Sequence, residues 1–142
     1  MKPYQSIDPA TGKISKSFSF ILSDELENVI DKASCAAQSW SHSSFKDRKS
    51  LLGDVAEALL EEKENLAELM SFEMGKPIAQ GRAEVEKCES VVRYYIENGE
   101  KLLQDNVILK EGRQVAKIVY EPVGCVLAIM PWNFPLWQLF RF

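Results

Sequence analysis

The loop around Asn133 is the part of the sequence whose residue types point most clearly to chemistry. Asn133 stands between Pro131 and Pro135, directly after an apolar run at 125–130. Because the two prolines restrict the backbone, they hold the asparagine carboxamide in a limited set of directions. A carboxamide held in this way is a suitable hydrogen-bond donor for negative charge that develops during a reaction. On physical grounds alone, an equally good interpretation is that Asn133 caps a turn or the following helix and its aromatic neighbours pack.

The three cysteines, Cys35, Cys88 and Cys125, are the other candidates for chemistry. They are far apart and form no CxxC pair, and His42 is the single histidine, so we expect neither a disulfide framework nor a zinc site. We expect each cysteine to be a reduced core residue. Cys125 lies inside the apolar run, where burial would desolvate a thiolate and make it a poor nucleophile.

The apolar run at 125–130 predicts a strand buried on both faces, as in a parallel α/β sheet. The loop at 131–135 then lies at the carboxyl end of this strand, where ligands bind in open α/β sheets, and a helix follows. A parallel strand requires a crossover and a neighbouring strand, but only 12 residues follow the run. We therefore expect an incomplete sheet in a chain that is cut off before its core is finished.

The rest of the chain is expected to be mostly helical, with short β-hairpins. The apolar period predicts four helices: from an N-cap at Ser23 to Trp40, from Ser43 or Ser44 onward, a third ended by Gly75, and a fourth from Pro77 to Gly99. Short strands are predicted at 4–7 and 18–22 around a turn at 8–12, and a hairpin is predicted from 107–109 and 115–120.

Composition and charge exclude several classes of function. The chain has 142 residues, a formal net charge of -4 and scattered basic residues, so we expect no nucleic-acid partner. No apolar stretch approaches the roughly 18 residues of a transmembrane helix, and no signal peptide is recognisable, so we expect no membrane association and a cytoplasmic location.

Four strings, taken in order, resemble the aldehyde dehydrogenase superfamily. They are IDPATG at 7–12, FEMGKP at 72–77, EPVG at 121–124 and AIMPWNFP at 128–135. The PWNFP string after an apolar segment is the specific signal, and the other strings support it. The resemblance covers essentially the whole chain, and residues 136–142 are most similar to the succinate-semialdehyde dehydrogenase branch.

This resemblance implies a fold and a division into domains. Residues 1–104 and 122–142 would belong to a nucleotide-binding α/β domain with a Rossmann-like parallel sheet, of which 122–142 supplies the first strand and the active-site loop. Residues 105–121 would be the hairpin of an oligomerisation extension, and the catalytic domain would be absent. The resemblance also implies NAD or NADP as the cofactor and a homo-oligomer when the protein is full length.

The family's mechanism implies roles for particular residues. A cysteine thiolate attacks the aldehyde to form a thiohemiacetal, a loop asparagine and a backbone N–H hold the oxyanion, and hydride passes to the nicotinamide. Asn133 matches the loop asparagine, and Ile129, Met130, Pro131 and Trp132 match positions beside the cofactor. The family's cysteine nucleophile and glutamate base lie beyond the point where this sequence ends, so we expect the chain alone to be inactive.

The helix expected after Pro135 indicates the charge of the substrate. Gln138 and Arg141 are three residues apart and would share one helix face, beside a second face with Trp137 and Phe140. We expect Phe134, Trp137, Gln138 and Arg141 to contact the substrate, with Arg141 binding the distal carboxylate of an anionic aldehyde such as succinate semialdehyde. Arg141 as a solvated or interdomain residue is the alternative, and the alternative function is a non-catalytic interaction module.

Overall fold

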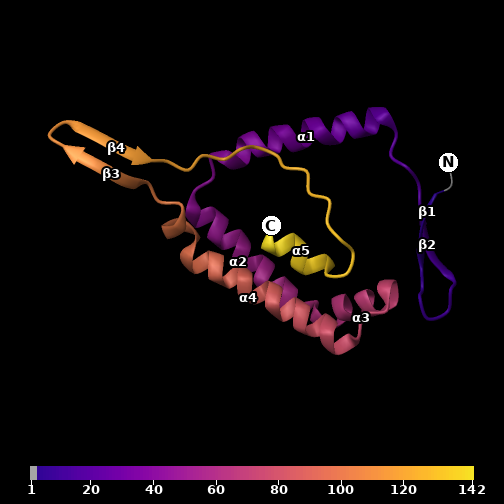
Figure 1. Ribbon diagram of the computed structural model, residues 1–142. Coiled ribbons are helices and arrows are strands. Elements are labelled where there is room, and N and C mark those ends of the chain that lie inside the picture. The colour runs from indigo at the N-terminus through magenta and orange to yellow at the C-terminus, as the bar shows by residue number, and fades with distance from the viewer. Residues whose placement is uncertain (1–2) are drawn as a thin grey trace.

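The computed structural model describes residues 3–142 as a mixed α/β chain (Figure 1). Its elements, in order, are β1 (Tyr4–Ile7), β2 (Ile14–Phe18), α1 (Ser23–Ser41), α2 (Phe45–Glu61), α3 (Lys63–Met74), α4 (Ile78–Leu102), β3 (Asn106–Glu111), β4 (Gln114–Ile118) and α5 (Pro135–Arg141). The predicted combination of amino-terminal helices and β-hairpins is therefore confirmed.

The core lies where α2, α3 and α4 pack together. Its buried apolar side chains are Ala56, Leu59, Met70, Val85, Cys88 and Val92. The last helix, α5, lies against this bundle and packs Leu136, Trp137 and Phe140 onto it (Figure 1). The segment at 131–135 is thus tied to the core at its carboxyl end.

The ends of the helices follow local chemistry in most cases. Ser44, one of the two predicted starts, caps α2, since its Oγ accepts a hydrogen bond from the Asp47 N–H at 3.1 Å. Gly75 ends α3 with a φ of 71°, a left-handed conformation that glycine adopts without steric cost. Two predicted ends are wrong. Leu22 rather than Ser23 caps α1, with the Glu25 carboxylate bound to its N–H, and α4 continues through Gly99 to Leu102.

Gly81 allows α4 to approach α3 closely. A Cβ atom at this position would lie 3.1 Å from both Cα and Cβ of Ala67. This distance is tighter than ordinary packing, so the absence of a side chain at Gly81 sets the separation of the two helices.

Both two-stranded sheets are antiparallel hairpins. The hairpin of β3 and β4 was predicted, with small differences in its bounds. The prediction of a strand at 18–22 is wrong, because the chain turns back earlier and β2 begins at Ile14. The Asp8 carboxylate accepts from the Ala10 N–H at 2.9 Å and the Thr11 hydroxyl at 2.7 Å, which closes a short turn.

The apolar run at 125–130 differs most from its prediction. It is neither buried nor a strand, and Leu127 and Ile129 are 86% and 89% exposed. The physical reason is that a parallel strand needs a neighbour, and the strands described in residues 3–142 all pair within their own hairpins. In Figure 1 the segment between β4 and α5 passes α1 and then turns back toward the bundle.

Helix α1 and the segment at 119–134 lie outside the core. Helix α1 buries none of its residues, although it carries the predicted apolar face. Cys88 is buried as predicted, but Cys35 and Cys125 are exposed, and the prediction of a core position for them is wrong. Cys35 and Cys125 are exposed for the same reason, because Cys35 lies on α1 and Cys125 lies in the segment at 119–134. None of the helices in residues 3–142 combines the length and apolar character that a membrane crossing requires.

Candidate functional site

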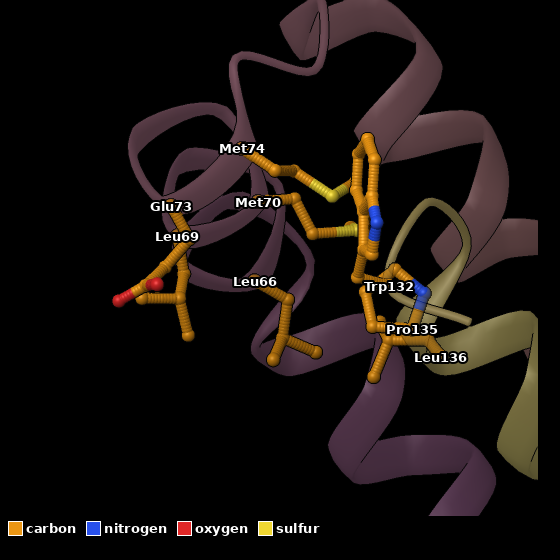
Figure 2. A pocket seen from close by; sticks show the side chains of 8 residues that line it. All are labelled: Leu66, Leu69, Met70, Glu73, Met74, Trp132, Pro135 and Leu136. Atoms are coloured by element: carbon orange, nitrogen blue, oxygen red, sulfur yellow. The ribbon is translucent and has the colours of Figure 1, made fainter. Parts of the chain in front are cut away.

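The loop that leads into α5 separates two hollows. Trp132 lines a hollow of about 570 Å³ between α3 and α5, together with Leu66, Leu69, Met70, Glu73, Met74, Pro135 and Leu136. Figure 2 shows the Met70 and Met74 side chains extending toward the Trp132 ring. Phe134 instead lines a second hollow of about 490 Å³ between α4 and α5. The loop therefore presents its two aromatic residues to different surfaces.

Asn133 lies between these two aromatic residues at the turn of the loop. It is exposed, and within residues 3–142 no partner is found for its carboxamide. Its backbone carbonyl, in contrast, accepts a hydrogen bond from Lys76 Nζ at 3.1 Å. The peptide of Asn133 is held while its side chain stays available to a ligand.

A buried ion pair between Lys76 and Glu84 lies under the loop. The two side chains are 4% and 1% exposed. Glu84 Oε2 pairs with Lys76 Nζ, and Glu84 Oε1 accepts from the backbone N–H groups of Leu136 at 3.0 Å and Trp137 at 2.9 Å. Lys76 Nζ also lies 3.8 Å from the centroid of the Phe134 ring, a cation–π distance. Lys76 and Glu84 therefore contact four residues of this segment, which are Asn133, Phe134, Leu136 and Trp137.

The sequence reasoning missed Lys76 and Glu84 as site residues. A signal for Glu84 was present, because it lies on the buried face of α4 formed by Gly81, Val85, Cys88 and Val92. A carboxylate on an apolar helix face needs a partner, and this requirement predicts a buried cation or backbone donors. The sequence around Lys76 gives no comparable signal. Lys76 lies between a glycine that ends a helix and a proline, as in an ordinary loop between two helices.

The predicted substrate residues lie together in the second hollow. Phe134, Trp137, Gln138 and Arg141 all line it, with Gln80, Ala83, Glu84 and Lys87 from α4 opposite. Gln138 and Arg141 therefore share a face as their spacing predicted. Lys87 Nζ lies 3.9 Å from the Trp137 ring centroid, which adds a second cation to this hollow. Trp137 and Phe140 both pack on the core, in agreement with the face that their spacing predicted.

The predicted cofactor residues at 129–132 precede the loop on the exposed segment. Ile129 and Trp132 are 89% and 74% exposed, and Met130 is 37% exposed. The segment belongs to no helix or strand. Its side chains and backbone are therefore accessible to a ligand.

The described cysteines differ in how accessible their thiols are. Desolvation by burial, with a smaller contribution from the Glu84 charge, raises the pKa of Cys88 from 9.0 to about 11. Cys125 is exposed, so the burial that was expected to make it a poor nucleophile is absent. Over residues 3–142, no three His, Cys, Asp or Glu side chains gather as metal ligands.

The fold and the loop define the class of protein to which the chain is related. The sequence profile described as the aldehyde dehydrogenase family matches residues 1–141, and the chain belongs to this family. The resemblance that the PWNFP string indicated is thus confirmed.

Two relatives with similar sequences are named as succinate-semialdehyde dehydrogenases. The chain is 40% identical over 136 residues to the Escherichia coli protein named succinate semialdehyde dehydrogenase, NAD(P)+, Sad, covering 96% of this chain and 29% of that protein. It is 41% identical over 137 residues to a probable succinate-semialdehyde dehydrogenase, NADP(+), of Synechocystis, covering 96% of this chain and 30% of that protein.

A solved structure shows the same fold. The succinic semialdehyde dehydrogenase of Streptococcus pyogenes, in complex with NADP+, superposes with a TM-score of 0.89 at 29% identity, covering 97% of this chain and 30% of that chain. The chain thus spans about three-tenths of the length of these relatives.

Proposed function

We propose that this chain supplies the oxyanion donor and one wall of the substrate site of an NAD(P)-dependent aldehyde dehydrogenase that oxidises succinate semialdehyde to its carboxylic acid. Family membership supports the reaction class, and the names of the relatives support the substrate. The observation that carries the proposal is the second hollow, where Arg141 and Gln138 lie beside Trp137 and Phe134, the residue that follows Asn133 in the chain.

In this proposal Asn133 donates a hydrogen bond to the oxyanion of the thiohemiacetal. Its support is the exposed carboxamide on a backbone that Lys76 holds in place. A donor that is already oriented before the reaction stabilises developing charge without a cost for reorganisation.

Arg141 binds the distal carboxylate of the substrate. A guanidinium can bind a carboxylate through two parallel hydrogen bonds, and such contacts are stronger than neutral ones. Gln138 lies on the same face and can donate to the same carboxylate. Phe134 and Trp137 line the same hollow, and their aromatic rings would exclude water from it.

Residues 129–132 lie along the ribose and phosphate side of NAD or NADP. Their exposed apolar side chains and accessible backbone fit a ligand with a flat ring system and polar linkers. The cofactor, when bound, accepts the hydride from the substrate. The proposal includes both NAD and NADP as cofactors, because the relatives' names include NAD(P)+ and NADP(+).

In this proposal, parts of the full-length enzyme outside these 142 residues supply the nucleophilic cysteine and the glutamate base, and we expect the 142 residues alone to be inactive. The β3–β4 hairpin extends away from the bundle and exposes all its residues, which fits a role in homo-oligomer formation (Figure 1).

A chimera tests the proposal. Residues 1–142 would replace the matching region of the Escherichia coli relative, and reduction of NAD and NADP would be followed with succinate semialdehyde. We expect the chimera to oxidise the aldehyde and the chain alone to give no reduced cofactor above background. Replacing Asn133→Ala in the chimera should lower kcat by roughly 10²- to 10³-fold, as for other oxyanion donors.

Asn28→Ala is the matched control, since Asn28 is an exposed asparagine on α1 whose side chain only donates to the Asp24 carbonyl. A folded chimera that binds cofactor but does not oxidise the aldehyde would overturn the proposed function. An Asn133→Ala chimera as active as the control would overturn the role of Asn133.

A further inference from the structure

We propose that the Lys76–Glu84 ion pair is a positioning device that holds the Asn133 loop and the start of α5 in one geometry. The inference rests on the proposed function for the role of Asn133. Its structural part, that these two side chains fix residues 133–137, can be tested without substrate or cofactor.

The contacts divide between the two ends of the segment. Lys76 Nζ donates to the carbonyl of Asn133 at 3.1 Å, before Pro135. Glu84 Oε1 accepts from the N–H groups of Leu136 and Trp137, after Pro135. Because the two side chains are paired with each other, the two ends of the segment are fixed relative to one another.

The Glu84 contact replaces partners that α5 cannot supply itself. The first N–H groups of a helix have no acceptor within the helix. Pro135 has no N–H, so Leu136 and Trp137 carry the first donors of α5, and both bind the same carboxylate oxygen. The first hydrogen bond within α5 is donated by Gln138 to the carbonyl of Phe134 at 2.9 Å.

Both side chains start from fixed backbone. Lys76 lies between Gly75, which ends α3 in the left-handed conformation, and Pro77, which precedes α4. Glu84 lies inside α4, on its buried face. A loop residue attached to such positions is held more accurately than one that depends on its own backbone.

Stability alone is a weak explanation for this pair. Removing two charges from water is costly, and well-packed apolar residues often replace buried ion pairs without loss of stability. Apart from the bond between them, the side chains of Lys76 and Glu84 form hydrogen bonds within residues 3–142 only with the segment that carries Asn133. This distribution indicates a role in setting the geometry of the loop.

Hydrogen exchange of single amides in the 142-residue chain tests the inference first. We expect the N–H groups of Leu136 and Trp137 to exchange at least roughly tenfold more slowly than in an unstructured peptide. Exchange of both at the unstructured rate would overturn the proposal, and this result needs no variant.

The double replacement Lys76→Met with Glu84→Leu removes the ion pair and tests whether it holds residues 136–137. It takes out both charges together, so neither is left buried without a partner. We expect the amides of Leu136 and Trp137 to lose their protection, while the core amides of α4 keep theirs. Unchanged protection at 136–137 would overturn the proposal.

The matched control removes Arg82 and Glu64, an exposed ion pair that joins α3 to α4. Arg82→Met with Glu64→Leu should leave exchange at 136–137 unchanged. An equal loss of protection in the control would show that the loop responds to any loosening of α3 and α4, which would also overturn the proposal.

Kinetics of the chimera test the link to Asn133. The Lys76→Met and Glu84→Leu chimera should lose roughly tenfold or more in kcat, with KM for the cofactor changed by less than about twofold. Equal kcat for this variant and the control would overturn the positioning role. If the loop is held but the unaltered chimera oxidises no aldehyde, the proposed function fails while the structural part of the inference stands.

Discussion

Cys88 shows how one buried side chain acquires an altered chemistry. Its thiol lies in the core next to Glu84, and desolvation together with this negative charge raises its pKa to about 11. Because the thiolate is the nucleophile, a thiol with a raised pKa reacts slowly at neutral pH. Cys35 and Cys125, in contrast, are exposed to solvent.

This difference predicts the pattern of thiol labelling. At neutral pH, iodoacetamide should modify Cys35 and Cys125 in the folded chain, and Cys88 should react only after denaturation. Peptide mass spectrometry would identify the labelled residues. Rapid modification of Cys88 in folded protein would contradict its burial.

The same pKa shift predicts a loss of stability at alkaline pH. The folded pKa of Cys88 is above its ordinary value of 9.0, so the unfolded chain loses this proton at lower pH than the folded chain. The contribution of Cys88 to stability is therefore fully present below pH 9.0 and is lost as pH rises toward about 11. Urea midpoints for the native chain and for Cys88→Ala would show this, with the weaker pH dependence in the variant.

Single residues were predictable from the sequence where their chemistry is local. The position of Ser44 as a cap follows from its own hydroxyl and the carboxylate three residues later. The ion pair of Lys76 and Glu84 with residues 133–137 joins positions more than 50 residues apart, and only the packing of α5 onto α4 brings them together.

Among the elements, the contact of α3 with α4 at Gly81 is the tightest constraint. Replacing Gly81→Val should push the helices apart at Ala67 and lower the free energy of unfolding by about 1–3 kcal/mol, as other overpacked sites do. Gly99→Val is the matched control on the same helix, because nothing lies within 4 Å of a Cβ atom there.

Urea unfolding followed by far-ultraviolet circular dichroism measures both variants. The Gly99→Val midpoint should stay near that of the unaltered chain, since valine is no worse than glycine inside a helix. A Gly81→Val midpoint equal to the control would mean that the two helices do not depend on this close approach.

The elements that the sequence predicted well are those whose pattern is self-contained. The apolar period of the helices and the short turn of the β3–β4 hairpin need no distant partner. The run at 125–130 has the composition of a buried strand, but a strand exists only when a neighbour binds its backbone. Its exposure here could not be read from its own residues.

For the whole molecule, exposed apolar surface is the feature with the clearest consequence. Val123, Leu127 and Ile129 lie on the segment before the loop and are more than four-fifths exposed, at 88%, 86% and 89%. Exposed apolar side chains that form a patch promote association. The chain should therefore bind a hydrophobic dye or self-associate.

Dye fluorescence and light scattering at increasing protein concentration test this expectation. Leu127→Glu with Ile129→Lys should reduce both signals, because the charges interrupt the apolar run. A monodisperse monomer with a sharp cooperative melt and no dye binding would contradict it.

The selectivity of the chimera for charged aldehydes tests the central claim most directly. Arg141→Leu should lower kcat/KM for succinate semialdehyde by roughly 30-fold, about 2 kcal/mol, as expected for the loss of a hydrogen bond between two charged groups. The value for an uncharged aldehyde of similar length should change little, and Arg93→Leu, at an exposed arginine on α4 paired with Glu89, should affect neither. An equal loss for both aldehydes in the Arg141→Leu enzyme, or no loss for either, would contradict the assignment of Arg141 to the substrate carboxylate.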